Sequence, residues 1–473
     1  MYYYGKDAPQ DYTKAMECYL KSAEQGHATA QNYAGNMYHE GLGVSQDFVK
    51  AAEWYLKAVD QGHASALKNV GNLYYGGNGV PQDYDKAMEW YLKAANQGHA
   101  TAQYSIGFMY QEELGIPQDY HKAMEWYLKA AKQGHITAQN YVGILYQDGR
   151  GVSQDYQSAM EWYLKAAKQG DAISQSNIGT MYRKGKGVEQ DYEKAVEWYL
   201  KASEQGNASA QSFLGELYQT GQGVLQNYQK AMEWFLKAAE QGHARAQCNI
   251  GFMYQMGQGV LQDYLKAVEW HLKAAEQGDV VSQALLAKMY QHGKGVSQDY
   301  QQAMDWYLKA ADQGDPVAQK NIGLMYQYGE GAPQNYQKAM EWLRKAADQG
   351  EVTAQYNVGC MYQDGKGVSQ DYRKAMSWYL KAAEQGLAVA QCDIGLLFQY
   401  GDGVSQNYEK AMEWFLKAAR QGDAVAQNNI GYMYHYGLGV PQDNQKAMEW
   451  YWKAAEQGHA TAKKNINSLY QNS

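Results

Sequence analysis

The stretch HATAQNYAGNMYHEGLGVSQDFVKAAEWYLKAVDQG, from His27 to Gly62, is repeated along nearly the whole chain. Its closing glycine returns every 36 residues, from Gly62 to Gly458, with no insertion or deletion. A fixed period of this length is typical of a solenoid, because one repeat cannot bury its own apolar face and must stack on its neighbours. Residues 27–458 therefore contain twelve complete repeats.

Each repeat is predicted to contain two helices joined by a glycine-rich loop. Small and apolar residues recur at helical intervals over residues 28–39 and again over residues 48–61, which predicts a helix A and a helix B. Asp47 is expected to cap helix B, and Gly62 fits the left-handed position that ends it. Residues 1–26 then form an N-terminal half-repeat with helix B only, and residues 459–473 form a C-terminal half-repeat whose helix A acts as a cap.

Several recurring positions lead to expectations about packing. Gly35 lies in the middle of helix A, where glycine costs roughly 1 kcal/mol relative to alanine, so we expect a close helix crossing there. Trp54 returns once in every repeat and is expected in the core, because its ring buries a large apolar area. Glu53 and Lys57 are spaced for an ion pair on an exposed face. Glu113 replaces a loop glycine in one repeat, which predicts a strained turn.

Composition limits the functions that the chain can have. The 473 residues carry a formal net charge of −8, which gives no basic footprint for nucleic acid. No stretch reaches the roughly 20 apolar residues of a membrane span, and the first residues lack the features of a signal peptide. The four cysteines do not form a disulfide framework, which favours a reducing compartment. We therefore expect a cytoplasmic protein without membrane insertion.

The repeat resembles a known family. The motif I-G-x-M-Y, seen at 322–326, and the run from Gly365 to Gly386, GKGVSQDYRKAMSWYLKAAEQG, are similar to the Sel-one-like repeat, a relative of the tetratricopeptide repeat. The resemblance implies an all-α, right-handed superhelix of antiparallel helix pairs that acts as a scaffold for protein complexes. Relatives serve in endoplasmic-reticulum quality control, in the regulation of fungal cell-wall synthases and in bacterial contact with host cells. A secreted branch carries a disulfide in each repeat and is linked to penicillin-type ligands, but this chain lacks those paired cysteines.

Catalytic and cofactor motifs are not found in the sequence. The loop glycines are followed by valine and a capped helix, without the lysine of a phosphate-binding loop. Histidine recurs at the start of helix A in six repeats, and Asp or Asn takes the same place in five others. Equivalent residues of stacked helices should lie of order 10 Å apart, too far to share one metal ion. We therefore expect these histidines to act as helix caps or loop residues, and we predict no metal, cofactor or catalytic residue.

Variation between repeats points to a candidate binding surface. One helix A position, Asn36 in the first complete repeat, changes freely while the packing positions barely change. By resemblance to tetratricopeptide arrays this position faces a concave surface. Its apolar members, which we take as candidate partner-binding residues, are Phe108, Ile144, Phe252, Leu324, Leu396 and Tyr432. Such residues can dock an apolar or helical segment of a partner, or they can simply cover neighbouring helices A.

These observations favour a non-enzymatic scaffold or adaptor that binds proteins or peptides of unknown identity along its concave surface. The alternative is a ligand-binding protein or weak hydrolase like the cysteine-rich branch. That alternative requires a polar pocket between helices, which the sequence does not display. The chain is therefore expected to assemble complexes by protein–protein interaction.

Overall fold

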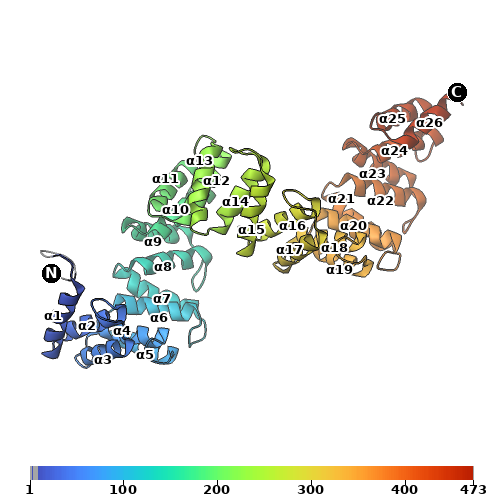
Figure 1. Cartoon of the computed structure of the whole chain (residues 1–473). Helices are drawn as coiled ribbons and strands as arrows, with labels where there is room; N and C mark the ends of the chain where they lie inside the picture. Colours follow the sequence, from blue (N-terminus) through green and yellow to red (C-terminus); the bar gives the residue numbers. More distant parts are fainter. Residues whose placement is uncertain (1–2, 4–8, 472–473) are drawn as a thin grey trace. The chain divides into compact units, whose positions relative to one another are not determined.

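The computed structural model describes residue 3 and residues 9–471, and every regular element in this part of the chain is an α-helix (Figure 1). The expectation of an all-α protein is confirmed for these residues. The chain forms two compact units, residues 1–241 and residues 242–473, which we call the N-terminal and C-terminal units. In both, even-numbered helices correspond to helix A of a repeat and odd-numbered helices to helix B.

The helices of the N-terminal unit are α1 (Tyr12–Glu24), α2 (Ala28–Glu40), α3 (Phe48–Val59), α4 (Ala64–Gly76), α5 (Tyr84–Asn96), α6 (Ala100–Gln111), α7 (Tyr120–Lys132), α8 (Ile136–Asp148), α9 (Tyr156–Lys168), α10 (Ala172–Lys184), α11 (Tyr192–Glu204), α12 (Ala208–Thr220) and α13 (Tyr228–Glu240). Those of the C-terminal unit are α14 (Ala244–Met256), α15 (Tyr264–Glu276), α16 (Val280–His292), α17 (Tyr300–Asp312), α18 (Pro316–Tyr328), α19 (Tyr336–Asp348), α20 (Val352–Asp364), α21 (Tyr372–Glu384), α22 (Ala388–Tyr400), α23 (Tyr408–Arg420), α24 (Ala424–Tyr436), α25 (Asn444–Glu456) and α26 (Ala460–Gln471).

The ends of helix B follow from local chemistry, as predicted. Asp47 accepts a hydrogen bond of 3.0 Å from the backbone N–H of Lys50 and so caps α3. Helix α3 ends at Val59, two residues earlier than predicted, because the chain turns through Asp60 and Gln61 before Gly62 adopts φ 73°. The N–H of the next residue then closes on the carbonyl of Ala58, which satisfies one of the last free acceptors of the helix.

The loop between helix A and helix B depends on a left-handed residue. Gly41 ends α2 with φ 70°, a conformation that glycine adopts without strain. Glu113 takes the equivalent place after α6 and is forced to φ 57°, the one non-glycine positive φ among the described residues. Helix α6 is one residue shorter than most of its counterparts, which confirms the predicted difference in this turn. In the usual loop Gln46 donates through Nε2 to the carbonyl of His39 at 2.8 Å and fixes the turn.

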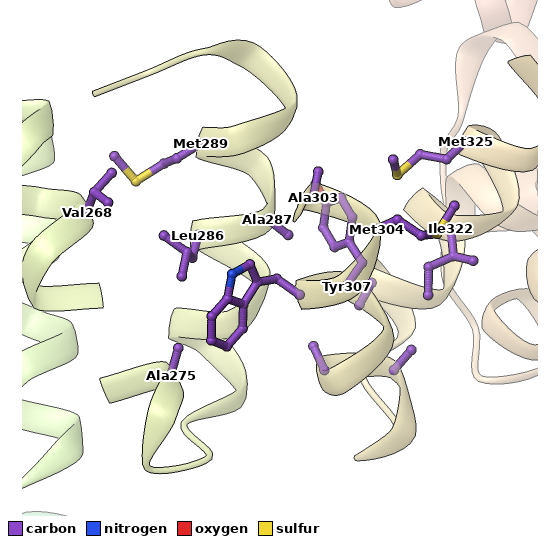
Figure 2. Packing of buried hydrophobic residues seen from close by; sticks show 14 of the residues in the cluster. Val268, Ala275, Leu286, Ala287, Met289, Ala303, Met304, Tyr307, Ile322 and Met325 are labelled. Carbon is purple, nitrogen blue, oxygen red and sulfur yellow. The ribbon is translucent and has the colours of Figure 1, made fainter. Parts of the chain in front are cut away.

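The close crossing predicted from the glycine of helix A is present in the helix pairs that keep this glycine. A Cβ added at Gly35 would lie 2.5 Å from the ring of Tyr55 on the following helix B, so the glycine leaves room for that ring to pack closely against helix A. Tyr55 and its counterparts in later repeats are almost completely buried. Figure 2 shows a helix pair of the C-terminal unit in which alanine, Ala287, takes the place of this glycine, and there too Tyr307 lies among side chains from α15 to α18 such as Leu286 and Ile322.

The tryptophans occupy a different environment from the one predicted. Most of them are half-buried, and only Trp306 and Trp378 are fully buried among the described residues. Trp90 packs against the core of the preceding helix pair and thus seals the junction between repeats. Its outer face is covered by Lys93, whose ammonium lies 4.1 Å from the ring centroid. The lysine that was expected to pair with glutamate therefore lies over the tryptophan instead.

Buried glutamines tie each repeat to the one before it. Gln139 on α8 donates through Nε2 to the carbonyl of Ala131 on α7 at 3.1 Å. Its Oε1 accepts a hydrogen bond of 2.8 Å from Gln169 at the end of α9. One buried amide thus joins three successive helices with both of its polar atoms satisfied. Leu67 holds this place in one repeat, where a purely apolar contact replaces the polar one.

Candidate functional site

The predicted binding residues lie on helix A, in the turn before the last one. Phe108 is on α6 and Ile144 on α8, in the N-terminal unit. The other four are in the C-terminal unit, on α14, α18, α22 and α24, namely Phe252, Leu324, Leu396 and Tyr432. Phe252 and Tyr432 are each 37% exposed, and the remaining four are half-buried.

The half-buried members of this set also contact the core. Leu324 packs against the cluster formed by α19 and α20, and Leu396 packs against the cluster formed by α23 and α24. Phe108 and Ile144 make corresponding contacts with the helix pairs that follow them. These side chains therefore cover neighbouring helices, and their role in partner binding stays a prediction.

Sequence reasoning missed a second set of residues, one turn further along helix A. Tyr328, Tyr400 and Tyr436 are 64%, 63% and 55% exposed, unusually open for tyrosine. Each follows a predicted binding residue by four positions, so the two side chains lie on the same face of the helix. In α24 the ring centroids of Tyr432 and Tyr436 are 4.5 Å apart, so side chains at this spacing are in contact. A search of helix A for apolar residues at i+4 would have found them.

The same face also carries exposed valines in the first turn of helix A. Val317, Val389 and Val425 precede the predicted residues by seven positions, about two helical turns. We call these residues the apolar stripe of the C-terminal unit, although α20, between α18 and α22, has Thr353, Cys360 and Asp364 at the corresponding positions. The apolar stripe consists of Val317, Leu324 and Tyr328 on α18, Val389, Leu396 and Tyr400 on α22, and Val425, Tyr432 and Tyr436 on α24. Helices α22 and α24 contact each other directly, so their parts of the stripe are neighbours.

The N-terminal unit does not have such a stripe on its helices A, as far as the structure describes them. There Phe108 is followed by Glu112 four residues later, and Ile144 by Asp148, so each apolar residue is next to a carboxylate. The two predicted residues of this unit therefore lie in a more polar setting than the four in the C-terminal unit. Among the described helices A, those with apolar side chains from the first turn to the last at these positions belong to the C-terminal unit.

Five of the six recurring histidines cap helix A through a side-chain hydrogen bond, as predicted, and His27 does not. His99 lies at the N-cap of α6, where its Nδ1 accepts a hydrogen bond of 3.3 Å from the backbone N–H of Ala102. Asn207 and Asp315 make the same kind of bond at 2.8 and 2.6 Å in other repeats. Burial lowers the pKa of His99, in keeping with a neutral ring whose Nδ1 accepts a hydrogen bond. Among the described residues no group of His, Cys, Asp or Glu could hold a metal ion.

The buried cysteines have the properties of core residues. Burial raises the pKa of Cys248 to about 12, and it also raises the pKa of Cys392. A thiol in such surroundings stays protonated at neutral pH and is a poor nucleophile. All four cysteines are free, so no pair reproduces the disulfide pattern of the cysteine-rich branch. Each helix of the described residues has 12 or 13 residues, fewer than the roughly 20 apolar residues that a membrane-spanning helix needs.

Paired helices that repeat every 36 residues and contact mainly their sequence neighbours define an α-solenoid. The Sel1 repeat model matches residues 1–27 and then twelve consecutive stretches from 28–63 to 424–459. The chain belongs to the Sel1 repeat family, whose α-solenoids typically serve as scaffolds for protein interaction.

Two solved structures are similar over most of their length. One is a protective antigen of uropathogenic Escherichia coli strains that displays an SLR fold; it is 37% identical, the match covers 97% of this chain and 94% of the antigen, and the TM-score is 0.66. The other is a Sel1 repeat protein from Oxalobacter formigenes, 35% identical, with 66% of this chain and 90% of that protein covered and a TM-score of 0.53. No curated protein matches the sequence.

Proposed function

We propose that this protein is a non-enzymatic scaffold that holds partner proteins against the apolar stripe of its C-terminal unit. The observation that carries the proposal is the exposure of Tyr328, Tyr400 and Tyr436 beside apolar residues of the same helix face. Exposed apolar surface costs free energy in water and is typical of interaction sites when it is contiguous. Membership of a family of interaction scaffolds supports the same conclusion.

The chemistry of the stripe favours an apolar protein segment as its ligand. Tyrosine offers a rigid ring with a hydroxyl at its edge, so it can cover an apolar partner while its polar atom stays hydrated. Leu324 and Leu396 are fixed by their contacts with the core, which limits the entropy lost on binding. A partner helix or extended segment with apolar residues along one side fits this surface.

The test compares capture of partners by three forms of the full chain. A variant with Tyr328→Ser, Tyr400→Ser and Tyr436→Ser removes exposed rings and should leave the thermal midpoint nearly unchanged, since surface changes alter stability little. A control with Leu261→Ser and Leu265→Ser removes exposed apolar area elsewhere in the same unit. Quantitative mass spectrometry of proteins retained from the source cell should show losses only with the tyrosine variant. If both variants retain the same proteins as the unaltered chain, the stripe is not the binding surface.

A further inference from the structure

The helices A of the first repeats enclose a polar hollow of about 780 Å³ in the N-terminal unit. Its size is within the range of about 300–1,000 Å³ seen for ligand sites. Its walls come from α2 and α4 and from the start of α6, and they include Asn32, Asn36, Ser65, Lys68, Asn72 and His99. Most of these side chains are amides, hydroxyls or cations, in contrast to the apolar stripe of the C-terminal unit.

Three asparagines direct hydrogen-bond donors into this hollow. The Oδ1 atoms of Asn32 and Asn36 both accept from Nδ2 of Asn69, at 3.0 and 2.9 Å. The Oδ1 of Asn72 accepts from the hydroxyl of Tyr91 at 2.8 Å. Because the oxygen of each amide is engaged, its NH₂ group is the part left for another partner. None of these three NH₂ groups meets an acceptor among the described residues, although Asn32 is only 6% exposed.

Lys68 adds a cation without a counter-charge. No carboxylate lies within 4.0 Å of its ammonium in the described part of the chain, and burial lowers its pKa. Lys320 occupies the same position of a later repeat and does have a counter-charge there. Its ammonium lies 3.9 Å from the carboxylate of Glu351 at the start of the next helix A. In the earlier repeat that place is taken by His99, which is neutral while it caps α6. Partial burial of an ammonium without an anion costs free energy, and a ligand anion would offset that cost.

The charge of the walls limits the ligand to a single negative charge. Glu40 also lines the hollow, with its carboxylate held by His39 at 2.8 Å, so it opposes a ligand of high negative charge. A phosphate group usually requires several cations, and Lys68 is the one lysine or arginine among the described residues that line this hollow. A carboxylate needs only one cation, and the carbonyl groups of a peptide chain suit the amide donors of the asparagines.

From these contacts we propose that the hollow binds a carboxylate of a peptide, with Lys68 as its counter-ion and Asn32, Asn36 and Asn72 as donors to the carboxylate or to adjacent peptide carbonyls. The carboxylate can belong to a chain terminus or to an aspartate side chain, since both present the same two oxygens. This site does not include residues of the apolar stripe, and the proposal for it does not depend on the function proposed for that surface.

Calorimetric titration of the full chain with acetylated hexapeptides of alternating alanine and glutamine tests the proposal. One peptide has a free carboxyl terminus, one is amidated, and one is amidated with a single internal aspartate. We expect the free acid or the aspartate peptide to bind at least about tenfold more tightly than the uncharged amide, as for a hydrogen bond to a charged group. The comparison of the two charged peptides distinguishes a terminal from a side-chain carboxylate.

Two variants make the test specific. Lys68→Gln should abolish the advantage of the charged peptides, whereas Lys320→Gln removes a lysine from the same position of another repeat and should leave it unchanged. Circular dichroism checks that both variants remain folded. The proposal is overturned if charged and uncharged peptides bind equally, if no peptide binds at millimolar concentration, or if Lys68→Gln has no effect. It is also overturned if inorganic phosphate binds more tightly than the charged peptides and depends on Lys68.

Discussion

At the scale of single residues, the tyrosine of helix B that packs closely against helix A also completes a partly buried hydrogen bond. The hydroxyl of Tyr379 donates to Oε1 of Gln363 at 2.9 Å, and Tyr307 makes the same contact with Gln291 at 3.1 Å. Where the tyrosine is replaced, the glutamine loses its donor. This happens at His271, Leu343 and Phe415, and Oε1 of Gln255, Gln327 and Gln399 has no partner in the described part of the chain.

His271 leads to a prediction about acid stability. Burial lowers its pKa to about 4, with Asp279 opposing the shift. As pH falls below about 6.5, His271 binds a proton in the unfolded chain but not in the folded chain. The free energy of unfolding therefore decreases until the pH reaches the pKa of the folded state. His271→Tyr removes this loss and gives Gln255 a donor. Denaturant unfolding should show a stabilisation of about 1 kcal/mol at pH 8 and about 2 kcal/mol more at pH 5.

A control for that prediction is available in a later repeat. Phe415→Tyr supplies the same hydroxyl to Gln399 without removing a titratable group, so its gain of about 1 kcal/mol should not depend on pH. If the gain from His271→Tyr is equal at both pH values, the histidine does not titrate as described. A loss of stability in both variants would show that these sites have no room for the hydroxyl.

At the scale of helices and loops, the two glycines of the loop have different reasons to be there. The first, such as Gly149 with φ 69°, adopts a left-handed conformation that ends helix A. The second, such as Gly151, also has a positive φ, and a Cβ at this residue would lie 2.3 Å from the carbonyl oxygen of Tyr120 in the preceding repeat. The first glycine therefore allows the backbone conformation of the turn, and the second also allows the backbones of two neighbouring repeats to pack closely.

The first position gives a matched pair of variants. Glu113→Gly should stabilise the protein by about 1 kcal/mol, because a side chain in the left-handed region is strained. Gly149→Glu creates the same strain in the next repeat and should destabilise by a similar amount or more, since its Cβ would lie 3.1 Å from Gln154. Thermal melts that shift in opposite directions would agree with this account. Equal shifts in one direction would show that the φ angle is not the cause.

At the scale of the whole molecule, extensive contacts within each unit connect helices that are adjacent in sequence. Damage to one repeat should therefore stay local. Tyr163 is fully buried on α9 and packs with residues of α8 and α10. Tyr163→Ala should remove about 3–5 kcal/mol of local stability, as for other large aromatic truncations in a core.

Hydrogen exchange can follow this effect along the chain. Loss of protection is expected in α8, α9 and α10, with helices of the C-terminal unit unchanged. Tyr400→Ala, which truncates an exposed ring, serves as the control and should leave protection as it was. Uniform loosening of both units by Tyr163→Ala would contradict a molecule whose stability is the sum of neighbouring repeats.

The sequence alone determined the features that depend on neighbours along the chain. A cap such as Asp47 bonds to an amide three residues ahead, and a left-handed glycine acts on its own turn, so both could be predicted from one repeat. The histidine caps were predicted for the same reason. The period of the repeats then indicated that these helix pairs stack, because no single repeat can bury its apolar face.

Tertiary structure decided which side chains those stacks bury and which they leave exposed. Trp54 and Tyr55 are consecutive aromatic residues on an amphipathic helix, yet only the tyrosine meets the glycine of helix A and is fully enclosed. For the candidate site, variation between repeats identified residues such as Leu396, but their contacts with the core and the exposure of Tyr400 depend on the helices packed beside them. The burial of a side chain depends on which residues lie next to it in space, and the spacing of residues along one helix does not specify those neighbours.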